Sequence, residues 1–189
     1  MARIVAGTAK GRTIKVPKSG TRPTSERARE GLFSRLDHLG YIRDCAVLDL
    51  FAGSGAIGLE AASRGARHVT CVDAAQQAAK VIEANARELG LDIDVVNLKA
   101  ETYLSQEPSV TYDLAVLDPP YDFPDDDVAL VLAALVPHLE PDAMVVVERS
   151  KKSPEPRWPD GLRLDDERKW GDTRVWSAVL DVETTKVEA

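Results

Sequence analysis

The sequence is poor in cysteine and histidine, the residues that stabilise small proteins through disulfides or bind metals. Its 189 residues include two cysteines and three histidines. Cys45 and Cys71 are far apart, in no CxxC pattern and beside no histidine, so we interpret both as core thiols rather than redox or metal-binding groups. The histidines show no ligand spacing, and no metal site is expected. A chain of this length buries roughly 70% of its unfolded surface without such staples.

Long hydrophobic runs are also lacking. No stretch approaches the roughly 20 apolar residues of a membrane span. Residues 1–10 lack the apolar segment of a signal peptide. The hydrophobic content of 44% and charged content of 29% are ordinary for one globular domain. We therefore expect a cytoplasmic protein with no membrane partner.

Charge is distributed unevenly along the chain. The net charge is −7, which argues against a nucleic-acid partner. Residues 1–35, however, carry nine basic and two acidic side chains, whereas residues 36–189 carry 15 basic and 29 acidic ones. An acidic body with a basic N-terminal segment is the asymmetry expected when that segment docks on a polyanion. Charge counts alone fit a solvated surface equally well.

Strand and helix patterns alternate from residue 46 onward. Near-continuous apolar strands between amphipathic helices predict a parallel sheet covered on both faces, an α/β fold. The expected strands cover residues 47–50, 69–73, 92–98, 114–117 and 144–148, and the expected helices cover residues 56–64, 75–89 and 128–139.

The two ends of the chain depart from this alternation. Residues 3–6 and 12–16 predict a β-hairpin, followed by a Pro/Gly linker and a helix that begins at Thr24 or Ser25 and ends at Gly40. Residues 162–169 and 173–181 predict a closing antiparallel hairpin around Trp170, which would complete a seven-stranded sheet. We divide the chain into a basic hairpin and linker (1–23), a catalytic domain (24–183) and a flexible tail (184–189).

The first expected strand leads into a glycine-rich turn, Asp49-Leu50-Phe51-Ala52-Gly53-Ser54-Gly55. Gly53 and Gly55 allow the backbone to pass close to a ligand at the carboxyl edge of the sheet. Asp73 lies 20 residues beyond Gly53, where a carboxylate accepts hydrogen bonds from ribose hydroxyls. The turn alone does not separate a nicotinamide cofactor from S-adenosylmethionine. The carboxylate of Asp49 within the strand favours S-adenosylmethionine, which carries a cationic amino-acid group.

A second motif, Asp118-Pro119-Pro120-Tyr121, follows the fourth expected strand. Two prolines make a rigid exit from the strand and remove two backbone donors, which leaves the Asp118 carboxylate and the loop carbonyls as acceptors. Acceptors for both hydrogens of an exocyclic amino group would localise the nitrogen lone pair for methyl transfer. Tyr121 offers a ring on which an extruded base can stack.

Together these motifs resemble the class I methyltransferases that modify base amino groups. Two segments are similar to one branch, the RsmD family of 16S rRNA guanine-N2 methyltransferases: the hairpin with Arg3-Ile4-Val5-Ala6-Gly7 and Gly11-Arg12, and the segment Arg22-Pro23-Thr24-Ser25-Glu26-Arg27-Ala28-Arg29-Glu30-Gly31-Leu32-Phe33. The resemblance covers nearly the whole chain. It implies a Rossmann-like seven-stranded fold with a small N-terminal hairpin and helix extension, S-adenosylmethionine as cofactor, and 16S rRNA of the small ribosomal subunit or its assembly intermediate as partner.

The resemblance also assigns roles to residues. It places Asp118, Pro119, Pro120 and Tyr121 at the target base. The expected cofactor-binding residues are Asp49, Phe51, Ala52, Gly53, Gly55, Asp73, Ala100 and Glu101, the last two after the third strand where such enzymes contact adenine. The expected RNA-binding residues, from the basic segment, are Arg3, Lys10, Arg12, Lys15, Arg22 and Arg27.

Two other functions stay open at this point. A methyltransferase acting on adenine N6 or cytosine N4 of DNA would use the same tetrapeptide, although the short basic segment and the lack of a recognition domain argue against reading duplex DNA. A non-catalytic RNA-binding ribosome-assembly factor could keep the fold. The intact glycine turn and the intact tetrapeptide argue against that reading.

Overall fold

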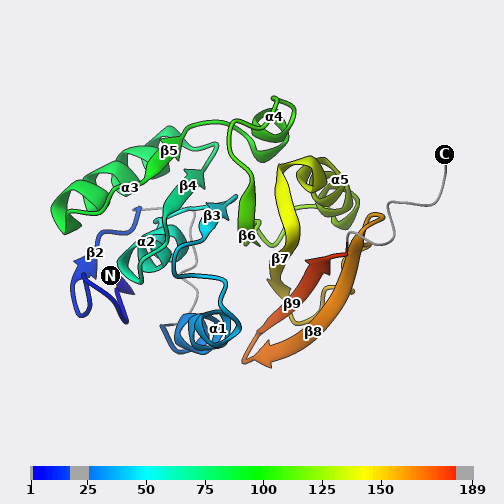
Figure 1. The fold of residues 1–189 in the computed structure, drawn as a ribbon, viewed down its shortest axis with the longest axis horizontal. Helices are drawn as coiled ribbons and strands as arrows, with labels where there is room; N and C mark the ends of the chain where they lie inside the picture. The colour runs from blue at the N-terminus through cyan, green and yellow to red at the C-terminus, as the bar shows by residue number, and fades with distance from the viewer. Residues whose placement is uncertain (1, 18–25, 182–189) are drawn as a thin grey trace.

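A mostly parallel seven-stranded sheet forms the centre of the protein (Figure 1). The computed structural model describes residues 2–17 and 26–181. The strand order is β5-β4-β3-β6-β7-β9-β8, in which β9 pairs antiparallel with both β7 and β8 and all other pairs are parallel. The prediction of five parallel strands closed by an antiparallel hairpin is confirmed. The strands are β3 (Ala46–Asp49), β4 (His68–Val72), β5 (Asp94–Val96), β6 (Tyr112–Leu117), β7 (Leu139–Ser150), β8 (Leu162–Trp170) and β9 (Thr173–Leu180).

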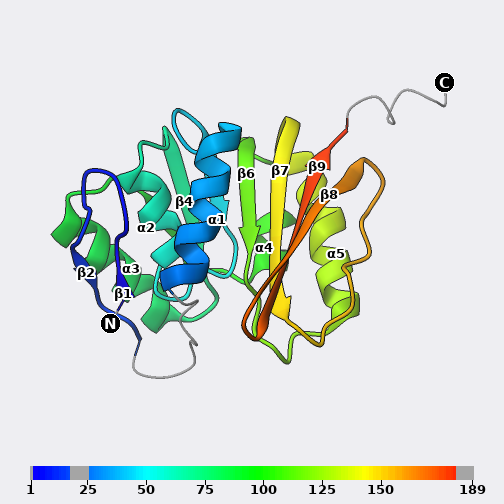
Figure 2. The same ribbon diagram turned by 90° about the horizontal axis from the view of Figure 1, so that it is seen from below.

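Helices cover both faces of the sheet (Figure 2). One face packs against α1 (Glu26–Leu39), α2 (Ala56–Ser63) and α3 (Gln76–Leu89) through a core that includes Phe33, Ile57 and Ile82. The opposite face packs against α4 (Ala100–Leu104) and α5 (Asp125–Leu135) through a core that includes Leu104 and Leu132. Side chains alternate between the two cores along β6 and β7, as expected for strands buried on both faces.

Several predicted boundaries are wrong. α5 begins at Asp125, because the three aspartates form its first turn, where carboxylates are favoured. It ends at Leu135, and a 3₁₀ turn containing Pro137 follows. β7 then starts at Leu139, five residues before the predicted strand. Helix α4 was not predicted, and the third parallel strand is shorter than the predicted 92–98.

The N-terminal hairpin is shorter than predicted and is built into the domain. Its strands are β1 (Ala2–Arg3) and β2 (Thr13–Ile14). The amides of Val5 and Ala6 donate to the buried carboxylate of Glu60 on α2, at 2.8 and 3.0 Å, rather than extending the hairpin ladder. Gly7 touches α2 so closely that an added Cβ would lie 1.8 Å from the Ser63 carbonyl oxygen. A separate core joins the hairpin to α2 and α3; it contains Ala2, Ile4, Ala9, Ile14, Leu59, Ala86 and Leu89.

Within residues 2–17 and 26–181, no helix has the length and apolar character needed to cross a membrane. The predicted start of the first helix at Thr24 or Ser25 lies outside the described residues, as do the tail and part of the linker.

Candidate active site

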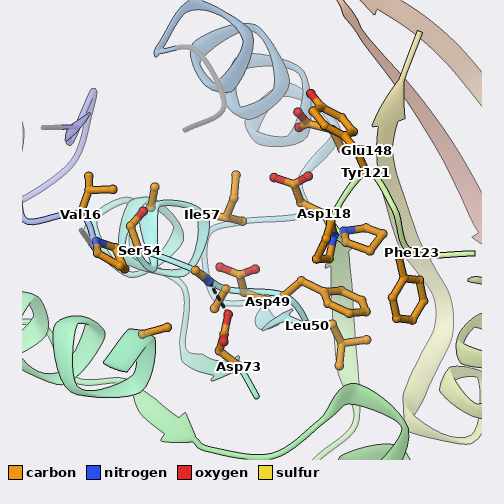
Figure 3. Close-up of a pocket in the computed structure, with 18 of the residues that line it drawn as sticks. Val16, Asp49, Leu50, Ser54, Ile57, Asp73, Asp118, Tyr121, Phe123 and Glu148 are labelled. Carbon is orange, nitrogen blue, oxygen red and sulfur yellow. Dashed lines mark hydrogen bonds between the residues drawn. The ribbon is translucent and has the colours of Figure 1, made fainter. Parts of the chain in front are cut away.

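A cavity of about 1850 Å³ opens at the carboxyl edge of the parallel strands (Figure 3). The loops after β3, β4 and β6 form its floor, and residues of α1, of the segment after β2 and of the β8–β9 turn complete its walls. The glycine turn ends 63 positions before the Asp118–Tyr121 tetrapeptide begins, and residues of both line this one cavity. Ligands of open α/β sheets bind at this edge.

The glycine turn is locked to the end of β4. The amide of Gly53 donates to one oxygen of the Asp73 carboxylate at 2.8 Å, and the amide of Ala75 donates to the other at 2.8 Å. Gly55 has a φ of 77°, a left-handed conformation that favours glycine. Gly55 itself does not line the cavity; it shapes the turn that presents Ala52 and Gly53. Asp73 is thus oriented by two backbone donors toward a ligand.

Asp49 is a buried carboxylate at the end of β3. It is 1% exposed and accepts a hydrogen bond from the amide of Gly58 at 3.0 Å. Burial raises the pKa of Asp49 from 3.8 to about 7; the Gly58 hydrogen bond opposes this shift, and the nearby carboxylates of Asp118 and Asp73 add to it. A cationic ligand group beside Asp49 would restore its ionised form.

Two phenylalanine rings, those of Phe51 and Phe123, line the cavity. Phe51 and Phe123 meet edge to face with ring centroids 5.3 Å apart. Ala100 is buried and Glu101 is exposed in the first turn of α4, and both line the cavity with Lys99. Phe123 was not among the predicted site residues. Its place three residues after Pro120 in the same loop was the signal available in the sequence.

The Asp118–Tyr121 tetrapeptide leaves the end of β6 as a rigid loop. Pro119 is buried, and the Tyr121 ring is 47% exposed at the cavity mouth. The Pro120 carbonyl accepts from the amide of Phe123 at 2.9 Å and from the Arg149 guanidinium at 3.3 Å. It is therefore turned into the protein. Asp118 and Pro119 both line the cavity, and Figure 3 shows the Asp118 carboxylate turned toward it.

Arg149 on β7 is hydrogen-bonded to this loop and holds its shape. The side chain is 4% exposed and donates to the Phe123 carbonyl at 2.6 Å and to the Asp125 carboxylate at 3.0 Å, besides Pro120. A buried guanidinium with these partners holds both ends of the loop segment that follows the double proline. Arg149 was not among the predicted site residues, since no local sequence pattern marks it.

Two further cavity residues lie on elements distant in the chain. Glu148 on β7 is 6% exposed and lines the cavity next to the tetrapeptide. Trp170, the last residue of β8, lines the cavity and packs over α1, where a Cβ on Gly31 would lie 3.4 Å from its indole ring. The sequence singled out Trp170 only as a turn residue and did not identify Glu148.

The predicted RNA-binding residues are dispersed. Arg3, Lys10, Arg12, Lys15 and Arg27 are exposed, and Lys15 and Arg27 also line the cavity. Two of them are tied to the end of α3: Arg12 donates to the Glu88 carbonyl at 2.6 Å, and the Lys15 ammonium lies 2.9 Å from the Glu88 carboxylate. The sixth, Arg22, lies outside the described residues. Their RNA contacts stay a prediction.

Comparisons with known proteins show which family this chain resembles. Residues 2–179 match the model of a family described as conserved hypothetical protein 95. Ribosomal RNA small subunit methyltransferase D of Haemophilus influenzae is 36% identical over 157 residues, covering 80% of each chain. The putative rRNA methyltransferase YlbH of Bacillus subtilis is 32% identical over 178 residues, covering 92% of this chain and 96% of that protein.

This chain belongs to the RsmD family of S-adenosylmethionine-dependent methyltransferases. Among solved structures, the putative methyltransferase yhhF of Escherichia coli has a TM-score of 0.85 and 30% identity, with 95% of this chain and 97% of that chain covered. The Rossmann-like methyltransferase fold predicted from the sequence is confirmed.

The cavity of this RsmD-family chain fits S-adenosylmethionine. Asp49 supplies a buried carboxylate for a cationic amino-acid end, and such a group would oppose the burial that raises its pKa to about 7. Asp73 presents a carboxylate oriented by backbone donors for a ribose. The aromatic pair of Phe51 and Phe123 suits a planar adenine. The cofactor is the one predicted from the sequence.

Proposed function

We propose that this chain is an rRNA methyltransferase that modifies the exocyclic N2 amino group of a guanine in 16S rRNA of the small ribosomal subunit. The observation that carries the proposal is the single cavity that joins the glycine turn to the Asp118–Tyr121 tetrapeptide. The names of relatives in Haemophilus influenzae and Escherichia coli, each a ribosomal RNA small subunit methyltransferase D, support this substrate. The cytoplasm, where ribosomal subunits are assembled, is the corresponding location.

The cavity residues assigned to the cofactor form what we call the cofactor half, and each has its own role. Asp49 holds the ammonium end with Ala52, Gly53 and Gly55 shaping the turn, and Asp73 accepts from the ribose. Phe51, Phe123, Ala100 and Glu101 would hold the adenine. When bound, S-adenosylmethionine supplies an electrophilic methyl group.

The base half of the cavity, which contains the Asp118–Tyr121 tetrapeptide, activates the nucleophile, the exocyclic amino nitrogen of the target base. The lone pair of an exocyclic amino nitrogen is delocalised into the ring. The Asp118 carboxylate and the Pro119 carbonyl accept its two hydrogens and draw the lone pair onto nitrogen, in a loop whose shape Pro119, Pro120 and Arg149 hold before the base arrives. The Tyr121 ring at the cavity mouth stacks on the base.

The basic N-terminal segment, residues 1–23, binds the RNA, as predicted from the sequence. The segment is positively charged, whereas acidic residues exceed basic ones by 14 in positions 36–189. Such a segment attracts phosphates that the acidic body repels. Because the described part of the hairpin is packed on α2 and α3, it presents its cations from a fixed surface.

The test is methyl transfer from labelled S-adenosylmethionine to naked 16S rRNA and to small subunits, followed by nucleoside analysis and mapping of the position. The expected product is N2-methylguanosine. The Asp118→Ala variant is the control for transfer by a contaminating enzyme. N6-methyladenosine or N4-methylcytosine as the product would contradict the proposal, as would the absence of transfer to both substrates.

A further inference from the structure

A second carboxylate, that of Glu148, shares the base half of the cavity with Asp118. β6 and β7 pair in parallel with Leu117 opposite Val147, so the next residues of the two strands, Asp118 and Glu148, come side by side at the carboxyl edge. Neighbouring strands are about 4.8 Å apart, which brings both side chains within reach of one planar base. Figure 3 shows both carboxylates turned toward the cavity.

The alternation of the strands places these two side chains on the same face of the sheet. Val116 and Val146, two residues earlier, both pack in the core beneath α1. Glu148 therefore points to the α1 side, where the cavity lies, whereas Arg149 points to the other side and clamps the loop. The Arg149 guanidinium therefore binds the Pro120 and Phe123 carbonyls from the face of the sheet opposite to Glu148.

A carboxylate that is 6% exposed at the end of the apolar run 143–147 is costly to bury unless it meets donors. Asp118 and Glu148 each interact with other parts of the protein. A carboxylate has two oxygens with about four lone-pair positions, so each can accept a further hydrogen bond from a ligand. Together they make a wall of acceptors beside Tyr121.

We propose that Glu148 is a specificity-determining residue that accepts the N1–H of guanine while Asp118 accepts from its 2-amino group. This inference rests on the proposed function. Guanine presents two adjacent donors on this edge, the ring N1–H and the exocyclic amino group. Adenine and cytosine present an amino group beside a ring nitrogen with a lone pair, which a carboxylate repels. The pair Asp118 and Glu148 therefore matches guanine and rejects the other two amino-bearing bases.

The experiment compares two target bases in two enzymes. The substrate RNA carries either guanine or 2-aminopurine at the mapped position; 2-aminopurine keeps the 2-amino group but has a lone pair in place of the N1–H. The enzymes are the full-length wild type and Glu148→Gln, whose amide is isosteric and can donate to that lone pair. Glu83→Gln, an exposed α3 residue outside the cavity, is the control for the change in charge.

We expect the wild type and Glu83→Gln to methylate guanine at least about 100-fold faster than 2-aminopurine, measured as kcat/KM, because a site built around a donor rejects the analogue that lacks it. In Glu148→Gln this preference should shrink to about tenfold or less, with S-adenosylhomocysteine affinity and melting temperature unchanged. A purely structural role for Glu148 would lower both rates together and leave their ratio intact.

An unchanged ratio in Glu148→Gln therefore overturns the inference. If that variant does not fold, the wild type decides: methylation of 2-aminopurine within tenfold of guanine overturns the inference, and rejection of 2-aminopurine supports it. Failure of the wild type to methylate guanine in any RNA contradicts the proposed function instead, and the two failures are thus distinguished.

Discussion

Cofactor binding should be coupled to the ionisation of Asp49. In the free protein burial raises the pKa of this carboxylate to about 7, so it is largely protonated below neutrality. A ligand ammonium placed beside Asp49 favours the ionised form and lowers the pKa. Binding therefore requires the loss of a proton at acidic pH. Affinity approaches its full value about one pH unit above 7 and falls as the pH drops through 7.

The magnitude follows from the fraction of ionised Asp49. With a pKa of about 7, roughly three quarters of the molecules are ionised at pH 7.5 and about 3% at pH 5.5. The association constant for S-adenosylhomocysteine, which carries the same amino-acid end, should fall by roughly 25-fold over this range. Isothermal titration calorimetry in buffers of different ionisation enthalpy measures both the affinity and the proton released on binding.

Two variants separate this coupling from a general loss of stability. Asp49→Asn should bind about tenfold or more weakly at pH 7.5 and lose the pH dependence, because no proton is exchanged at this position. Asp73→Asn should also bind more weakly but keep the pH dependence. A flat pH profile in the wild type, or a retained profile in Asp49→Asn, would refute the reasoning.

The same pKa has the opposite consequence for the stability of the free protein. The pKa of Asp49 is higher in the folded chain than the ordinary value of 3.8, so ionising Asp49 destabilises the fold as pH rises from about 4 to 7. The full cost, reached above pH 7, is on the order of 4 kcal/mol. Asp49→Asn should accordingly raise the melting temperature of the free protein at pH 8 while weakening cofactor binding.

Three further predictions concern the base half and the basic segment. Asp118→Ala should keep S-adenosylhomocysteine affinity within roughly tenfold but lower kcat by about 100-fold or more, through loss of a preorganised acceptor; an unchanged kcat would make Asp118 only a turn residue. Arg149→Met keeps the apolar stem but frees the loop carbonyls, so single-turnover methyl transfer should slow by at least about tenfold with little change in cofactor affinity; Arg149→Lys should recover part of the rate. In the Arg3→Ala/Lys10→Ala double variant, RNA affinity and its log–log salt slope should both fall, the slope by up to about 1.4 on single strands; equal slopes in the variant and wild type would assign docking to another surface.

The sequence determined the parts of the site that depend on a few consecutive residues. The turn at Gly53 and Gly55 needs glycine because of its backbone conformation, and the exit at Pro119 needs the fixed φ of proline, so both were visible as local patterns. The order of strands and helices was visible for the same reason, since hydrophobic periodicity is local. Asp49, Asp73 and Asp118 follow because each ends a buried strand at the ligand edge of the sheet.

Tertiary structure decided which distant residues join these motifs. Glu148 reaches Asp118 only through the register of β6 with β7, a register that shifts between Tyr112 and Leu114 and that no local pattern encodes. Trp170 enters the cavity because the end of β8 lies against α1 at Gly31. Contacts between residues 30 or more positions apart depend on how strands pair and layers pack, and a short sequence pattern contains neither.

Sequence and tertiary structure each determine part of the basic N-terminal segment. Its charge was evident from composition, but its place was set by the buried carboxylate of Glu60, which takes the amides of Val5 and Ala6, and by Asn85, which bonds both the amide and the carbonyl of Lys15 at 2.9 Å. Buried polar groups need partners, and here these partners come from α2 and α3. The sequence thus determined that a cationic segment exists, and the packing of the hairpin decided where its cations point.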